Sequence, residues 1–274
     1  MKKILVLMTV LVFVLSASLQ AQNRTLKKVM ELQMPKTVDD DMPGTRGASV
    51  CWNPVTKKYY AVFAGNMGYP LGVFDANGKL LSGEDRTAMV DTRGLWYNPV
   101  TKKVSGNGYD VNGWFTYTLN AQGIPTDHKV DFEGQHQPDG QCVGVYDAAS
   151  KSIMFLLGSQ VHFYDAATAD SNKAMQIHWG RKKEQGPADN EDAYASNEDY
   201  NYTSFVYTGI KGAQLGFLNI TNKEIELYNY STGYQQQVLS LPDNAVLEAS
   251  FNFAFANGIY WLFNIQDRKW VGYK

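Results

Sequence analysis

Cysteine, charge and long apolar runs are all scarce in this chain. Its 274 residues include only Cys51 and Cys142, and 19% of them are charged, with a formal net charge of −2. A small fold stapled by disulfides is therefore excluded, and a near-neutral chain gives no reason to expect nucleic acid or another polyanion as partner. We expect both cysteines to be buried free thiols, because the repeat pattern described below puts them in non-adjacent blades.

Only one long apolar run is present, and it lies at the N-terminus. Lys2 and Lys3 precede an apolar stretch over 4–14, and Ser18-Leu19-Gln20-Ala21 then places small residues at −3 and −1 of a cleavage point. This pattern predicts a signal peptide over 1–21 rather than a membrane anchor, because a bilayer span needs about 20 apolar residues. We expect the mature chain, 22–274, to be exported to the periplasm or the extracellular space, with no membrane span after cleavage.

A short phrase repeats and predicts the architecture. Residues 52–58 read Trp-Asn-Pro-Val-Thr-Lys-Lys, and residues 97–103, which start 45 positions later, read Tyr-Asn-Pro-Val-Thr-Lys-Lys. A degenerate copy covers 146–152, and weaker ones cover 207–212 and 255–258. A period of about 45 residues is typical of a propeller blade.

Short apolar runs around each copy predict five blades in a single all-β domain. The predicted strands are 47–52, 59–64, 71–75 and 79–81; 94–97, 103–106, 114–119 and 126–130; 141–146, 153–157, 161–165 and 174–178; 203–208, 214–219, 225–230 and 236–241; and 249–255, 259–264 and 269–273. The last blade is one strand short, and the alternating segment 26–34 supplies a spare strand. We predict that this N-terminal strand pairs with the C-terminal blade and closes the ring. Six blades or a β-sandwich are the alternatives, although a sandwich does not explain the repeat.

The turn phrases and the Phe74-Asp75-Ala76-Asn77-Gly78-Lys79 hairpin resemble those of secreted bacterial β-propellers of the NHL or YncE-like kind. The leader ending in Leu19-Gln20-Ala21-Gln22 is similar to those of Bacteroidota. The resemblance implies a propeller that binds proteins, sugars or small molecules, and some relatives are lactonases or hydrolases. No catalytic motif of such relatives matches here, and a fold by itself implies no activity.

Polar residues are expected to gather at one mouth of the central channel, where the links between blades open. We name this the link end, and the opposite end, which carries the Asn-Pro-Val-Thr-Lys-Lys turns, the turn end. Convergent polar groups on a concave scaffold are the default binding site. The predicted ligand-binding residues at the link end are Arg46, Tyr69, Arg93, Tyr109, Asp110 and Asp139. The arginines would hold a carboxylate or a sugar edge, and the tyrosines would supply stacking area.

Catalysis and metal binding have weaker candidates. Asp139 or Glu198 with His136 could serve a hydrolase or lyase of glycosidase or lactonase type. The acidic run that includes Asp189, Glu191 and Asp192 could bind Ca²⁺, although no ligand spacing is recognisable and no cofactor is required. The polar insertion over 181–201 is a further candidate, as the docking loop of an interaction scaffold.

The leading expectation is thus an exported, non-catalytic, monomeric propeller. It would bind a small molecule, a glycan or a protein at the link end of its channel. The two alternatives are the hydrolase or lyase and the scaffold.

Overall fold

The computed structural model of the chain describes residues 24–36, 46–181 and 195–274. The predicted signal peptide and the predicted acidic Ca²⁺ candidates Asp189, Glu191 and Asp192 therefore lie outside the described residues, as does most of the polar insertion. Among the described residues there is no helix with the length and hydropathy that crossing a bilayer requires.

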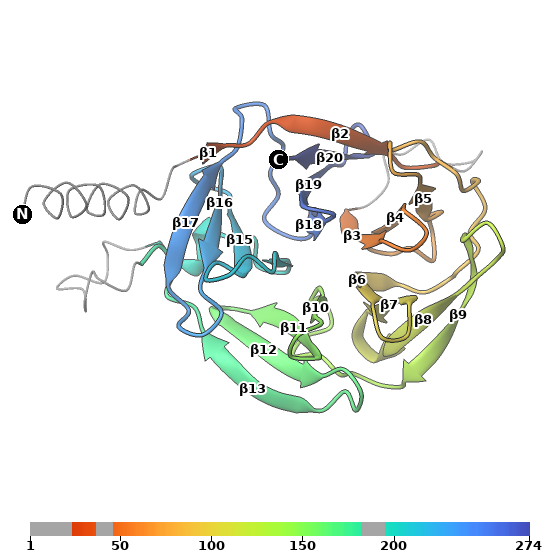
Figure 1. Cartoon of the computed structure of the whole chain (residues 1–274), viewed down its shortest axis with the longest axis horizontal. Helices are drawn as coiled ribbons and strands as arrows, with labels where there is room; N and C mark the ends of the chain where they lie inside the picture. The colour runs from red at the N-terminus through yellow and green to blue at the C-terminus, as the bar shows by residue number, and fades with distance from the viewer. Residues whose placement is uncertain (1–23, 37–45, 182–194) are drawn as a thin grey trace, which may run out of the picture.

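The chain forms a five-bladed β-propeller, as the repeat predicts (Figure 1). Blade I contains β3 (Gly47–Asn53), β4 (Lys58–Phe63) and β5 (Gly72–Phe74). Blade II contains β6 (Thr92–Asn98), β7 (Lys103–Gly108), β8 (Trp114–Leu119) and β9 (Pro125–Phe132). Blade III contains β10 (Val145–Asp147), β11 (Ser152–Leu157), β12 (Gln160–Asp165) and β13 (Ser171–Gln176). Blade IV contains β14 (Val206–Tyr207), β15 (Leu215–Asn219), β16 (Glu224–Tyr228) and β17 (Gln235–Ser240). Blade V contains β18 (Phe253–Ala256), β19 (Ile259–Asn264), β20 (Lys269–Tyr273) and β2 (Lys28–Gln33).

The ring closes through the N-terminal strand, which confirms that prediction. β2 runs antiparallel to β20, with Leu32 opposite Trp270. The preceding β1 (Arg24–Thr25) pairs in parallel with β17 of blade IV, which the sequence pattern did not indicate. One short segment therefore ties the outer edges of two blades together (Figure 1).

Blade I differs from the prediction, because its expected fourth strand over 79–81 is reduced to a single bridge between Phe74 and Leu80. The Asp75 carboxylate accepts hydrogen bonds from the backbone N–H groups of Asn77 and Lys79, so a tight turn follows β5 directly. The Leu81 N–H also donates to the Val73 carbonyl, so only a short stretch of chain pairs along the outer edge of β5.

The repeated turn phrase has a direct structural explanation. The side-chain oxygen of Asn53 accepts from the N–H groups of Val55 (3.0 Å) and Thr56 (3.2 Å), and Asn98 makes the same two contacts in blade II. Such Asx turns end a strand and reverse the chain. The lysine that follows takes a left-handed conformation, with φ 53° at Lys57 and 57° at Lys102.

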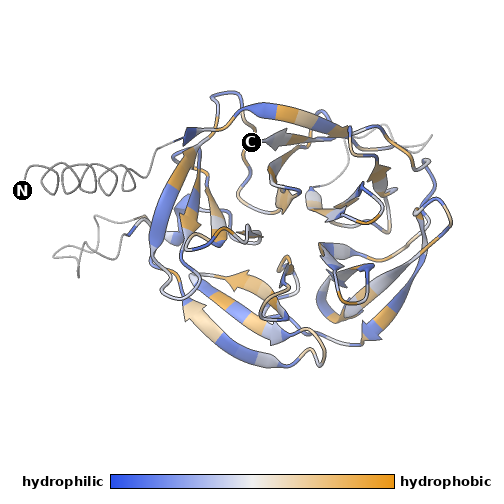
Figure 2. Cartoon of the chain, viewed as in Figure 1, coloured by the Kyte–Doolittle hydropathy of each residue, from blue (hydrophilic) through white to orange (hydrophobic). Residues whose placement is uncertain are grey.

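The core is divided among the blade interfaces. Five clusters of buried apolar residues each lie between two neighbouring blades; Trp261 and Trp270, for example, pack with Tyr59 between blades V and I. Hydrophobic residues alternate with hydrophilic ones along the strands (Figure 2). Cys51 and Cys142 are buried free thiols in blades I and III, as expected.

Candidate functional site

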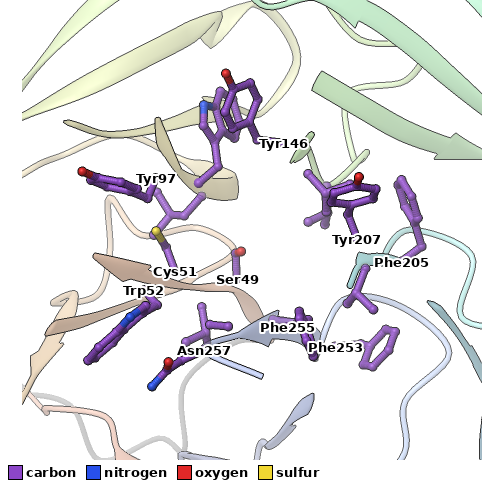
Figure 3. Close-up of a pocket in the computed structure, with 18 of the residues that line it drawn as sticks. Ser49, Cys51, Trp52, Tyr97, Tyr146, Phe205, Tyr207, Phe253, Phe255 and Asn257 are labelled. Carbon is purple, nitrogen blue, oxygen red and sulfur yellow. The ribbon is translucent and has the colours of Figure 1, made fainter. Parts of the chain in front are cut away.

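A cavity of about 290 Å³ occupies the axis of the propeller, where all five innermost strands meet (Figure 3). Its wall follows each innermost strand to the C-terminal end and includes Pro54 and Asn257 of the adjoining turns. The cavity therefore opens at the turn end, opposite the mouth that the sequence analysis favoured. Its volume is at the lower end of the range for small-ligand pockets, about 300–1,000 Å³.

Each innermost strand places one aromatic side chain at this mouth (Figure 3). We call this set the mouth aromatics: Trp52, Tyr97, Tyr146, Tyr207 and Phe255. All five are half-buried, and each lies immediately before the residue that enters the turn. Because the blades repeat around the axis, equivalent positions in sequence become neighbouring positions around one opening.

Contacts within the blades hold several mouth aromatics in place. Trp52 packs against Tyr59 with ring centroids 4.5 Å apart, and Phe255 packs against Tyr260 at 4.8 Å. Among the described residues, no mouth aromatic has a ring contact with another. The rings therefore surround the opening without filling it.

Tyr207 lies near a buried carboxylate of the neighbouring blade III, that of Asp147. The Asp147 carboxylate accepts hydrogen bonds from the Ser150 hydroxyl (2.6 Å) and the Ala149 N–H (2.9 Å). Burial and then the Asp147 carboxylate raise the pKa of Tyr207. Burial opposes ionisation of Asp147, but these hydrogen bonds outweigh it and lower the pKa of the carboxyl group. Tyr207 is accordingly a neutral hydroxyl at the mouth.

Among the described residues, those that line the cavity include no charged side chain and few polar groups. Ser49 and Asn257 line it, and the Asn257 amide donates to the Tyr59 hydroxyl at 2.8 Å. The innermost strands are also sheet edges, so part of their backbone N–H and C=O groups face the axis unpaired by a neighbouring strand. Aromatic faces with scattered hydrogen-bonding groups suit an uncharged polar ligand.

The wall is poorly equipped for acid–base or nucleophilic chemistry. It contains no aspartate, glutamate or histidine, and its one thiol belongs to Cys51. Burial raises the pKa of Cys51 far above its ordinary value, which keeps the sulfur protonated and unreactive.

The link end of the channel is closed by packing and hydrogen bonds. Phe251, 7% exposed, belongs to the same buried cluster as Ala48, Leu95 and Val143 of other blades. Inter-blade bonds run from the Asn252 N–H to Gly47 (2.8 Å) and from the Val143 N–H to Thr203 (3.2 Å). These contacts replace the longer innermost strands that the sequence predicted for blades III to V.

Arg93 is part of this closure. Its guanidinium forms an ion pair with Asp91, donates to the Gln141 side chain (3.0 Å), and lies over the rings of Tyr109 (4.7 Å) and Phe251 (5.5 Å). The side chain is only 7% exposed. Because Arg93 is already paired and covered, it offers little to an added carboxylate.

The other predicted ligand-binding residues are divided between two places at the link end. Asp110 lies beside Tyr109 in the 3₁₀ turn η1 (Asp110–Asn112), and the Asp110 N–H bonds to Gly140. Tyr69 packs against Phe63 (5.3 Å) and the guanidinium of Arg268 (5.4 Å), and Arg46 is exposed. None of them lines the axial cavity, and their role in binding stays a prediction.

The predicted catalytic residues do not form a hydrogen-bonded constellation. Both ring nitrogens of His136 lie against backbone carbonyls, those of Ala169 (3.2 Å) and Glu133 (2.9 Å). Asp139 accepts from the backbone N–H of Gln141, and Glu198 lies exposed in η4 (Asn197–Asp199). In the described ranges no hydrogen bond or ion pair joins any two of the three. The same ranges hold no cluster of three or more metal-ligating side chains.

The mouth aromatics are functional candidates that the sequence reasoning passed over. The signal was visible, since Trp52, Tyr97 and Tyr146 stand at the same place in the three clearest copies of the repeat. The long polar loops, which are the usual sign of a binding face, lie at the link end and indicate the other mouth.

Comparisons with known proteins identify the fold. No family model matches the chain, and no curated protein matches it. The crystal structure of Myxococcus xanthus glutaminyl cyclase is similar, with a TM-score of 0.56 and 8% identity over 92% of this chain and 96% of that one. The β-propeller domain of Myceliophteria thermophila Cps50 (Swd1) gives a TM-score of 0.43 and 11% identity over 83% of this chain and 82% of that one. At 8% identity the likeness to the glutaminyl cyclase concerns the fold alone and assigns no activity.

Proposed function

We propose that the chain is an exported, non-catalytic binding protein that takes up an uncharged sugar unit through the mouth aromatics. The observation that carries the proposal is the set of five half-buried aromatic side chains at equivalent positions around an axial cavity whose wall has no charged group. Export rests on the leader sequence alone.

A sugar fits this wall better than an apolar side chain does. The apolar face of a sugar ring stacks on aromatic faces. Its hydroxyls can reach Ser49, Asn257 and the open backbone edges of the innermost strands. An apolar side chain in the same place would leave those buried polar groups unsatisfied, at about 1–3 kcal/mol each. The absence of an acid–base pair from the wall supports binding without turnover.

The test measures binding of neutral oligosaccharides by calorimetry to the mature chain and to Tyr146→Ala. Aromatic contacts contribute about 0.5–1.5 kcal/mol each, so the variant should bind about 2- to 12-fold more weakly. Tyr202→Ala is the matched control, because Tyr202 is 58% exposed and does not line the cavity. We expect it to bind like the parent.

Two results would contradict the proposal. The first is that Arg46→Ala loses binding while Tyr146→Ala binds like the parent. This would show that the binding site lies at the link end. Oligosaccharides that emerge shortened, as read by mass spectrometry after prolonged incubation, would show that the protein is an enzyme.

A further inference from the structure

Exposed lysines surround the mouth aromatics. One lysine lies in the turn that follows the innermost strand of each of blades I to IV: Lys57, Lys102, Lys151 and Lys211. In blade V the equivalent turn contains Gly258, and the Nζ of Lys274 lies 3.7 Å from where a Cβ on that glycine would be. We call these five residues the rim lysines. Every blade thus contributes one ammonium group outside its own mouth aromatic.

The rim lysines are not neutralised within the described part of the protein. None of the five forms an ion pair there, whereas Lys28, Lys129 and Lys269 each pair with a carboxylate at 2.8–3.2 Å. Their charge is therefore available to a partner.

Carboxylates are distributed unevenly between the two ends of the described part of the protein. Carboxylates gather in the link-end loops: Asp91, Asp110, Asp139, Glu198, Asp199, Glu248 and Asp267. At the turn end, Asp75, Asp147 and Asp165 accept hydrogen bonds within their own turns, whereas Asp127 and Asp170 are exposed. The net charge of −2 is a property of the whole sequence and does not report how charge is distributed over the surface.

We propose that the ligand is an acidic glycan. One uncharged face of a sugar unit enters the axial cavity, and carboxylate or sulfate groups on the adjoining units lie against the rim lysines. This inference rests on the proposed sugar site and adds the charge of the ligand. A flat anionic bilayer would contact the lysines but would leave the cavity without an occupant, so the cavity favours a polymer with a unit that can enter it.

The experiment compares three oligosaccharides of equal length: a neutral glucan, an oligosaccharide in which neutral and uronate units alternate, and one in which neutral and sulfated units alternate. Binding is measured at about 50 and about 500 mM NaCl, because the screening length for exposed charges falls from about 14 Å to about 4 Å over this range. We expect the anionic ligands to bind more tightly at low salt and the neutral one to be insensitive to salt. Preference between the two anionic ligands separates carboxylate from sulfate recognition.

The variant Lys57→Gln/Lys102→Gln/Lys151→Gln/Lys211→Gln removes four rim charges. Exposed ion pairs are worth about 1.5- to 5-fold in affinity each, so the loss of four should weaken anionic ligands by roughly 5- to 600-fold and leave the neutral one little changed. Lys223→Gln is the control. Lys223 is exposed, has a left-handed turn conformation like that of Lys57 (φ 55° against 53°), and lies at the link end.

The outcomes separate the two proposals. One outcome is binding that does not depend on salt, that Tyr146→Ala weakens and that the four-lysine variant leaves unchanged. That outcome would overturn the acidic glycan as ligand, but the proposed sugar site would stand. No binding to any of the three glycans would overturn both. Binding to anionic vesicles or nucleic acid that survives Tyr146→Ala, without glycan binding, would identify the basic end as a different kind of surface. Circular dichroism and the Tm of each variant exclude misfolding as the cause.

Discussion

Glu226 should be the most costly single carboxylate to remove from this protein. It lies on β16 between blades III and IV and is only 3% exposed. Its two oxygens accept hydrogen bonds from Asn219 (2.9 Å), Gln235 (2.7 Å), Tyr200 (2.9 Å) and Tyr228 (2.6 Å). Burial and the charge of Glu226 raise the pKa of both tyrosines, so both remain hydrogen-bond donors.

The size of the effect follows from these four donors. In Glu226→Leu one tyrosine hydroxyl can still donate to the other, 3.4 Å away, so three buried donors lose their acceptor, at about 1–3 kcal/mol each or roughly 3–9 kcal/mol together. The variant recovers several kcal/mol, because a carboxylate no longer has to be desolvated. We expect a net loss of about 3–5 kcal/mol, as for other broken buried charge networks. In a chain of this size that lowers the Tm by about 6–20 °C.

The assay is thermal and urea unfolding of the parent, Glu226→Leu and Glu226→Gln. The glutamine variant keeps one acceptor oxygen and can donate to a tyrosine hydroxyl, so it should lose only about 1–2 kcal/mol. Glu84→Leu, at an exposed position between blades I and II, should stay within about 0.5 kcal/mol of the parent. A Glu226→Leu protein as stable as Glu84→Leu would refute the reasoning.

Three further predictions concern closure, thiols and pH. Deleting residues 24–34 removes β1 and β2 and opens the ring. The shortened chain should fail to fold, or its Tm should fall by at least 10 °C, which corresponds to about 3 kcal/mol. The control, a chain that starts at residue 22, should be stable. Burial raises the pKa of Cys142 to about 12 and that of Cys51 further. Neither thiol should therefore react with a disulfide reagent at about pH 8 until the protein is unfolded in guanidinium. Rapid reaction in the native state would contradict their burial. Burial lowers the pKa of His162 and His178 below the ordinary 6.5. As the pH drops below about 6.5 the unfolded chain therefore takes up protons before the folded protein does, and the free energy of unfolding should fall. A variant with asparagine at both positions and an unchanged pH profile would show that these rings are not responsible.

The sequence by itself determined the repeat and therefore the architecture. The strand ends are marked locally by three residues at fixed spacing: an asparagine that can form an Asx turn, a proline and a lysine. The contacts of Asn53 and Asn98 show these Asx turns. The spare alternating segment at the N-terminus was enough to predict ring closure, because an unpaired last blade needs a strand. These signals act between residues near one another in the chain or through period alone.

Only the tertiary structure decided which end of the channel is open. The closure of the link end depends on Arg93, Phe251 and Asn252, which meet from blades far apart in sequence, and no local pattern announces such contacts. The mouth aromatics and the rim lysines are equally long-range features. Each is one ordinary residue per repeat, and the fivefold arrangement of the blades turns them into a ring of aromatic faces inside a ring of positive charge.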